Sequence, residues 1–157
     1  MKIRVLIILL TVLVFSCKEK GVVFNESYSF ENKVWSKNDT LIFPFSIPDT
    51  IKQYNIYINL RTSDSYYWSN IYFFTELSFP NHQIRRDTLE FTLTDNSGKW
   101  LGKNSGTIID NQLPLYLNSR FPISGDYSLT VFQAMREPEL YEILDFGIKI
   151  KEVIEFN

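Results

Sequence analysis

The sequence predicts an all-β protein, an antiparallel β-sandwich that is jelly-roll-like, and three observations carry this prediction. Short apolar segments alternate with polar ones along most of the chain, and turn-forming residues separate them. Aromatic residues make up 16% of the chain, and such side chains favour strands. Outside the N-terminus, no long segment repeats apolar residues at helical spacing. We therefore expect about eight or nine strands, close to the eight of a jelly roll.

A lipoprotein signal peptide is predicted over residues 1–16. Lys2 and Arg4 supply positive charge, an apolar run covers residues 5–15, and Ser16 precedes Cys17, the single cysteine. A cysteine directly after a small residue is what bacterial lipoprotein signal peptidase requires, so we expect Cys17 to be acylated and to become the N-terminus. The alternative is an uncleaved membrane helix, but the run is only about half of the roughly 20 apolar residues that a span needs.

The mature chain is expected to be a short tether followed by one domain. Residues 17–21 hold the lipidated cysteine and the tether, and residues 22–157 are long enough for a single β-sandwich with one core. The predicted strands are residues 40–46, 54–61, 68–75, 88–94, 99–109, 113–121, 127–133 and 146–150.

Alternation and turn residues justify the strands of the first half. Pro44 marks the first of them as an edge strand or a bulge, because proline cannot donate to a sheet. The segment 54–61 alternates most clearly, with Tyr54, Ile56, Ile58 and Leu60 on the inward face. Residues 68–75 are apolar at nearly every position, which indicates a central strand.

The second half follows the same pattern. In 88–94 we expect Leu89, Phe91 and Leu93 to point inward and Thr94 to point outward. Residues 95–98 form a turn, 99–109 resume extended structure and 113–121 form a weaker strand. Tyr127, Leu129 and Val131 share one face of the next strand, and Phe146, Ile148 and Ile150 belong to the last. Residues 137–144, with Pro138 in first position, predict a helical turn.

Charge and cysteine usage exclude several classes of function. The formal net charge is −2, and removal of Lys2 and Arg4 leaves the mature chain at about −4. An acidic body without a basic cluster argues against a nucleic-acid partner and against direct adsorption to anionic lipid. Once Cys17 is acylated no thiol remains, so the fold is held without a disulfide.

No motif for catalysis or metal binding stands out. His82 is the single histidine and lies in a polar loop, so neither a general base nor a zinc site is predicted. Asp95, Asn96 and Asp110 offer oxygen ligands for Ca²⁺, but their spacing matches no calcium loop. We expect no enzymatic activity, no metal or other cofactor and no small-molecule substrate.

Four residues are candidates for partner binding. Trp68 and Asn70 lie in an aromatic-rich segment, Trp100 lies between two glycines, and Arg136 ends an alternating strand. One interpretation is structural: both tryptophans fill the core, Asn70 satisfies backbone groups in a bend, and Arg136 pairs with an internal acid. The other is a surface for a protein or a sugar, because Trp, Tyr and Arg dominate interface hot spots.

Several blocks together resemble a known family. They include Tyr67-Trp-Ser-Asn70, Gly98-Lys-Trp-Leu-Gly102, Gln133-Ala-Met-Arg136 and Asp145-Phe-Gly147, all after a lipoprotein signal. In order and spacing they resemble the gliding-motility lipoprotein family GldH of Bacteroidetes, over residues 24–153.

This resemblance implies a role rather than a reaction. It implies an envelope lipoprotein without catalytic activity that works with other gliding and secretion proteins, in an apparatus tied to type IX protein secretion. Only Cys17 receives a role from the family, as the acyl acceptor. Residues 18–21 lack the run of acids that can direct such lipoproteins outward, so the resemblance implies an outer-membrane anchor facing the periplasm. The alternative hypothesis is a carbohydrate-binding jelly-roll lipoprotein of the envelope.

Overall fold

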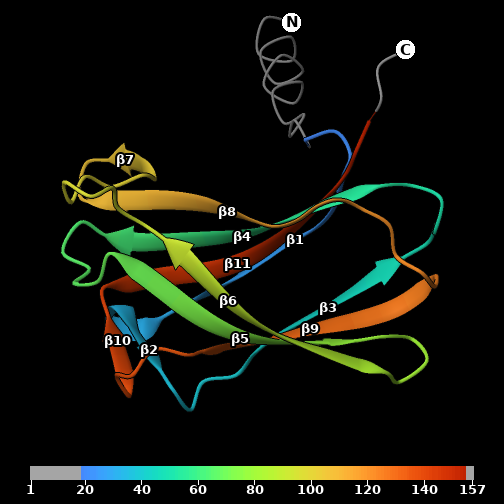
Figure 1. Cartoon of the computed structure of the whole chain (residues 1–157), viewed down its shortest axis with the longest axis horizontal. Helices are drawn as coiled ribbons and strands as arrows, with labels where there is room; N and C mark the ends of the chain where they lie inside the picture. Colours follow the sequence, from blue (N-terminus) through green and yellow to red (C-terminus); the bar gives the residue numbers. More distant parts are fainter. Residues whose placement is uncertain (1–18, 155–157) are drawn as a thin grey trace, which may run out of the picture.

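The computed structural model describes residues 19–154, so the predicted signal peptide and Cys17 lie outside the described residues. Two antiparallel β-sheets pack face to face (Figure 1). The first has the strand order β1-β11-β4-β8-β7, the second has the order β3-β9-β5-β6, and a small sheet of β10 and β2 lies at one end. Over residues 19–154, no helix has the length and apolarity that crossing a membrane would require.

The strands follow one another with a single 3₁₀ turn near the start. Their bounds are β1 Val22–Ser29, the turn η2 Glu31–Lys33, β2 Val34–Ser36, β3 Leu41–Ile47, β4 Tyr54–Ser63, β5 Asn70–Ser78, β6 Ile84–Thr92, β7 Lys103–Ser105, β8 Ile108–Ser119, β9 Gly125–Gln133, β10 Glu139–Tyr141 and β11 Ile143–Glu152.

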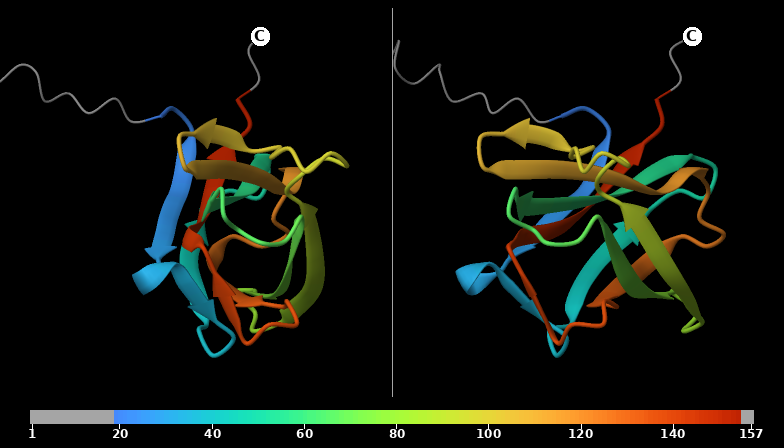
Figure 2. Two further views of the ribbon diagram at one scale, coloured as in Figure 1. Left: turned by 90° about the vertical axis from the view of Figure 1, so that its left-hand side faces the viewer. Right: turned by 60° about the vertical axis from the view of Figure 1, so that its left-hand side comes forward.

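The connectivity confirms the predicted jelly roll. Without the three-residue strands β2, β7 and β10, eight strands remain. Numbered in chain order, they form sheets 1-8-3-6 and 2-7-4-5, the arrangement of two interlocked Greek keys. Successive strands therefore cross between the sheets, except in the β5–β6 hairpin. The first and last strands lie side by side, as the blue and red ribbons of Figure 2 show.

The core lies between the sheets and is rich in aromatic rings. Trp35 is completely buried at its centre, with ring centroids 5.6 Å from Phe73 and 5.2 Å from Phe146. The inward faces predicted from alternation are buried as expected; they comprise Tyr54, Ile56, Ile58, Leu60, Tyr127, Leu129, Val131, Phe146, Ile148 and Ile150. Pro44 lies in β3, which is an edge strand, and β5 lies in the interior of its sheet, as predicted.

Some predicted elements were wrong. The helical turn at residues 137–144 is instead the strand β10, which pairs with β2 and places Leu140 opposite Trp35 in the core. Long-range burial of Leu140 therefore overrides the local helical signal. Thr94 is buried rather than outward, because it forms a β-bridge with Trp100. The segments 99–109 and 113–121 divide differently, into the short β7 and the long β8.

The end of the predicted tether is attached to the fold. Glu19 forms ion pairs with Lys149 and Lys151 of β11, at 2.9 Å from the Lys151 ammonium. The backbone carbonyl of Gly21 accepts a hydrogen bond of 2.8 Å from the amide of Glu152. The two ammonium groups lower the pKa of the Glu19 carboxyl. Within the described residues, the chain therefore contacts the sandwich from Glu19 onward.

Candidate functional site

Three of the four predicted binding residues meet at one surface hollow of about 580 Å³. Trp68 and Asn70 reach it from the start of β5, and Arg136 reaches it from the segment that follows β9. Its other lining residues are Tyr72, Ala134, Met135 and Glu137. The hollow therefore combines an aromatic wall with both signs of charge.

A buried glutamine shapes the segment that carries Arg136. Gln133 is only 2% exposed, and its side-chain oxygen accepts a hydrogen bond of 3.0 Å from the amide of Met135. Its side-chain nitrogen donates to the carbonyl of Glu137 at 2.9 Å. These two hydrogen bonds close a tight loop after β9. In this loop Met135 is buried and Arg136 is exposed to solvent.

The expectation that Arg136 pairs with an internal acid is wrong. Its side chain is exposed, and none of the ion pairs within residues 19–154 includes it. Its backbone carbonyl accepts a hydrogen bond of 3.4 Å from the Lys37 ammonium. The loop held by Gln133 turns the guanidinium outward, so this charge is available to a partner.

A carboxylate orients the polar wall of the hollow. The Asn70 amide donates to Glu90 at 2.8 Å, and the Tyr72 hydroxyl donates to the same carboxylate. These contacts, that of Tyr72 first, lower the pKa of Glu90, and the contact with Glu90 raises the pKa of Tyr72. The structural interpretation assumed that the Asn70 side chain bonds backbone groups in a bend. It instead donates to Glu90 on the neighbouring strand β6.

A second hollow of about 460 Å³ shares Trp68 and Glu137 with the first. Two exposed tyrosines rim it: Tyr67 is 85% exposed and Tyr141 is 63% exposed. The Tyr67 ring packs edge-on against Trp68, with centroids 4.9 Å apart. Because the hollows adjoin, they form one continuous surface. We call it the Trp68 surface, and it consists of Ser65, Tyr66, Tyr67, Trp68, Asn70, Tyr72, Ala134, Met135, Arg136, Glu137, Glu139, Leu140, Tyr141 and Glu142.

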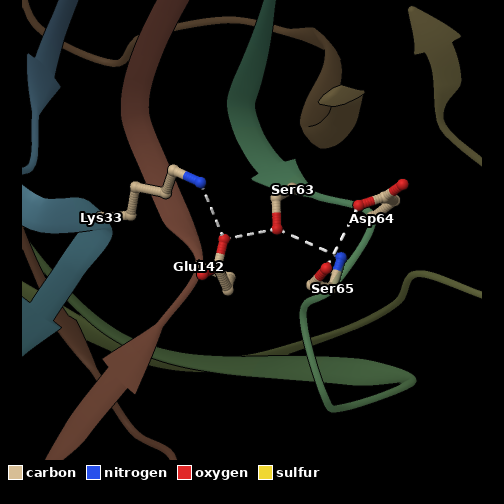
Figure 3. A network of polar contacts seen from close by, with 5 residues as sticks. All are labelled: Lys33, Ser63, Asp64, Ser65 and Glu142. Carbon is tan, nitrogen blue, oxygen red and sulfur yellow. Dashed lines mark hydrogen bonds and ion pairs between the residues drawn. The ribbon is translucent and has the colours of Figure 1, made fainter. Parts of the chain in front are cut away.

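A polar network fixes the base of this surface (Figure 3). The Glu142 carboxylate accepts a hydrogen bond of 2.6 Å from the Ser63 hydroxyl and pairs with the Lys33 ammonium at 3.1 Å. Both contacts lower the pKa of Glu142, and the contact with Ser63 is the larger cause. Glu142 has a φ of 65°, a left-handed conformation that is costly outside glycine. The network joins β4, η2 and the turn between β10 and β11.

Trp100 lies apart from the Trp68 surface. It lines neither hollow. It is half-buried against the core and forms the β-bridge with Thr94. This position favours the structural interpretation, in which Trp100 packs against the core. Sequence reasoning missed Ser63 and Glu142 as supports of the surface, because their contact joins segments far apart in the chain. It also missed Gln133, although the contacts of Gln133 with Met135 and Glu137 are local. Only the aromatic cluster at residues 66–68 gave a local signal.

Asp95, one of the residues considered as a calcium ligand, is engaged within its own turn. One oxygen of Asp95 accepts hydrogen bonds from Ser97 and from the amide of Lys99, which closes a turn. Within the described part of the chain, no group of three or more His, Cys, Asp or Glu side chains is placed to hold a metal ion. His82 is exposed in the turn between β5 and β6.

Comparisons with known proteins agree with the resemblance in the sequence. The model of a family described as "GldH lipoprotein" matches residues 22–150. A "gliding motility lipoprotein GldH homolog" of Christiangramia forsetii is 33% identical over 155 residues, which cover 94% of both chains. The "gliding motility lipoprotein GldH" of Flavobacterium johnsoniae is 28% identical over 154 residues, again with 94% coverage of each.

Solved structures are similar only at a coarse level. Part of a family GH115 4-O-methyl-α-glucuronidase superposes with a TM-score of 0.45 and 11% identity, covering 87% of this chain and 18% of that one. A periplasmic lysozyme inhibitor of Aeromonas hydrophila gives a TM-score of 0.34 and 13% identity, covering 87% of this chain and 91% of that one.

Proposed function

The chain belongs to the GldH lipoprotein family, and from this membership we propose that it is a non-enzymatic interaction module of the gliding apparatus, linked to type IX protein secretion. Gliding-motility lipoproteins are proteins of the cell envelope. The lipid on Cys17 would anchor this one, with the domain on the periplasmic side of the outer membrane. The Trp68 surface would bind other gliding or secretion proteins of the envelope.

One observation supports this proposal above the others: Trp68, Asn70 and Arg136 converge on one hollow. Tyr, Trp and Arg side chains dominate the energetics of protein interfaces. Hydrogen bonds from Gln133 hold the loop that carries Arg136, and Glu142 bonds Ser63 beneath the surface. The surface is therefore pre-organised for a partner. Pre-organisation reduces the entropy that binding must overcome.

The position of the surface suits an anchored protein. β1 begins at the attachment point of the tether and runs to η2, beside the end that carries β2 and β10 (Figure 1). Eight residues of strand span about 25 Å. The Trp68 surface therefore lies at the far end of the sandwich from the tether. Confinement to a membrane raises the effective concentration of partners, so a modest interface suffices.

Replacement of the lipidated cysteine tests the anchor. We expect Cys17→Ala to fold normally, to leave the membrane fraction and to abolish gliding, because the acyl chains supply about 0.8 kcal/mol per buried CH₂. The readouts are membrane fractionation and colony spreading at equal protein levels. Normal gliding by a protein that is released from membranes would refute the need for the anchor.

Exposed residues of the Trp68 surface test the binding role. Tyr67→Ala and Arg136→Glu change side chains that face solvent, so we expect stability to change little and gliding to be lost. Leu117→Ala and Arg120→Glu make the same kinds of change at exposed positions elsewhere and are expected to glide normally. Normal gliding by the combined Tyr67→Ala/Arg136→Glu protein would refute the proposal.

A carbohydrate-binding role is the second candidate, because aromatic faces next to amide and charged groups also suit sugars. Trp68 lies in the wall of the hollow, so a bound glycan would change its fluorescence. We expect envelope glycans to cause neither a fluorescence change nor a thermal shift. A saturable fluorescence change that Trp68→Phe removes would favour the carbohydrate role.

A further inference from the structure

One edge of the second sheet is open. The other outer strands of the two large sheets are shorter or interrupted: β3 carries Pro44, and its Ile42 carbonyl accepts a hydrogen bond of 2.9 Å from the Tyr28 hydroxyl. The outer strand β7 has three residues, and β1 contains a bulge near Val22. β6 has nine residues, contains neither proline nor glycine and pairs with β5 in an unbroken register. It is the outer strand of its sheet. It is the kind of edge on which another strand can be added.

The backbone groups that face this edge can be identified. The amide of Leu93 donates to Ser69 just before β5, and the carbonyl of Asp87 accepts from the Thr75 hydroxyl in β5. Odd-numbered residues of β6 therefore direct their N–H and C=O groups toward β5, and even-numbered residues direct theirs toward the open edge. The even-numbered side chains are all exposed on the outer face; they are Ile84, Arg86, Thr88, Glu90 and Thr92.

We propose that a second copy of this chain pairs with β6, antiparallel and around a two-fold axis at Thr88. In this register Thr88 lies opposite Thr88 of the second copy, and Arg86 lies opposite Glu90 in both directions. Opposite charges directly across an antiparallel pair are stabilising, and like charges are destabilising. An axis at Arg86 would instead place Arg86 opposite Arg86 of the second copy, and an axis at Glu90 would place Glu90 opposite Glu90. The charge pattern thus selects one register of self-pairing.

Neighbouring side chains support the same register. Arg86 already pairs with Glu76 of β5 at 2.6 Å yet remains 70% exposed, so its guanidinium has room for a second carboxylate. Phe74 lies opposite Thr88 in the β5–β6 register and is 51% exposed. Pairing would place the two Thr88 side chains between two Phe74 rings and reduce the exposed apolar area.

The symmetry agrees with attachment to one membrane. Antiparallel edge-to-edge pairing requires a two-fold axis perpendicular to the sheet, so both copies keep the same face of the joined sheet on the same side. The β1-containing sheets, and with them both tethers, then lie on one side. The common side of the two tethers matters only with the proposed lipid at Cys17, whereas the pairing of β6 does not depend on that lipid.

Cysteine cross-linking at the axis tests the pairing. Directly paired residues have Cα atoms about 5.5 Å apart, within the range of a disulfide. We expect full-length Thr88→Cys, oxidised in native membranes with copper-phenanthroline, to give a disulfide-linked dimer on non-reducing gels. Wild type controls for any unacylated Cys17. Ser46→Cys, exposed on the shielded strand β3, controls for random collision. Dimer yields for Thr88→Cys no higher than for Ser46→Cys would overturn the proposal.

Charge reversal tests the register. In the Thr88→Cys background, Arg86→Glu or Glu90→Arg alone is expected to lower the dimer yield several-fold, and the two together to restore it. Self-pairing in this register would be overturned if the Arg86→Glu, Glu90→Arg and combined variants gave equal dimer yields. It would also be overturned if Thr88→Cys cross-linked to a different protein. We also expect the wild-type protein to be a dimer in mild detergent. Thr88→Pro removes one N–H that faces the open edge, so it should abolish this dimer while the thermal midpoint stays close to that of the wild type. β6 lines neither hollow of the Trp68 surface, but Glu90 bonds Asn70 and Tyr72 there. Thr88→Cys and Thr88→Pro leave Glu90 unchanged, so failure of these two tests leaves the proposed function standing.

Discussion

At the scale of single residues, the Trp68 surface is held by polar side chains that have partners within the fold, whereas Tyr67 and Arg136 face solvent. Gln133 bonds two residues of the loop that follows it, and Glu142 bonds Ser63 and Lys33 from two other segments. Buried or half-buried polar groups of this kind are costly when a partner is missing, so they specify one arrangement of the chain. The exposed residues Tyr67 and Arg136 stand on this framework and are free to meet a partner.

Gln133 is predicted to be the most sensitive of these supports. Gln133→Leu keeps the volume but leaves the amide of Met135 and the carbonyl of Glu137 without partners, which should cost about 1–3 kcal/mol. Urea unfolding measures the loss. Gln112→Leu removes an exposed hydrogen bond to Asn59 and should cost little. Equal stability of the two variants would contradict this role of Gln133.

Glu19 gives a pH prediction. Lys149 and Lys151 lower the pKa of its carboxyl below the ordinary 4.5, so the ion pairs stabilise the folded state above that pH. The contribution is lost as the pH falls through the lowered pKa of the folded state. An NMR titration should place the Glu19 midpoint below 4.5 and move it upward in Lys149→Ala/Lys151→Ala. A wild-type midpoint at or above 4.5 would show that the tether is not attached in this way.

At the scale of elements, alternation predicted the strands that bury one face, and it failed where burial is decided elsewhere. β4 and β9 show strict alternation and were predicted correctly. β1 is exposed at most positions, so its residues carry no period that a sequence reader could recognise. β2 and β10 exist because they pair with each other about a hundred residues apart, around Trp35 and Leu140. Sequence distance also hid the contact between Ser63 and Glu142, although the aromatic cluster at residues 66–68 located the wall of the site.

The pairing of β1 with β11 depends on the absence of a side chain at Gly147. A Cβ there would lie 2.8 Å from the carbonyl oxygen of Glu26 and 2.9 Å from the Cβ of Ser27. Gly147→Ala should therefore push β1 away at a cost of about 1–3 kcal/mol and speed amide exchange in β1. Gly106→Ala, where the added Cβ has open space, should strain its turn and leave β1 exchange unchanged. Slow exchange in β1 of Gly147→Ala would contradict this account.

At the scale of the whole molecule, the jelly roll separates the roles of its two ends. The tether joins at one end, beside the last strand, and the Trp68 surface occupies the other, beside β2 and β10 (Figure 1). The topology was predictable from the number and spacing of strands, whereas the convergence of Trp68 with Arg136 was not, because it depends on how β9 pairs with β5. With the proposed lipid on Cys17, the domain would present this surface at the end away from its anchor.

Affinity capture from gently solubilised membranes tests the central claim most directly. The tagged full-length protein is compared with Tyr67→Ala/Arg136→Glu, with Arg120→Glu and with Trp100→Phe, at equal expression, and co-purifying proteins are identified by mass spectrometry. We predict that gliding or secretion proteins of the envelope accompany the wild type and both single variants and are lost from the double variant. The same proteins bound equally by the double variant, or lost only from Trp100→Phe, would contradict the assignment of binding to the Trp68 surface.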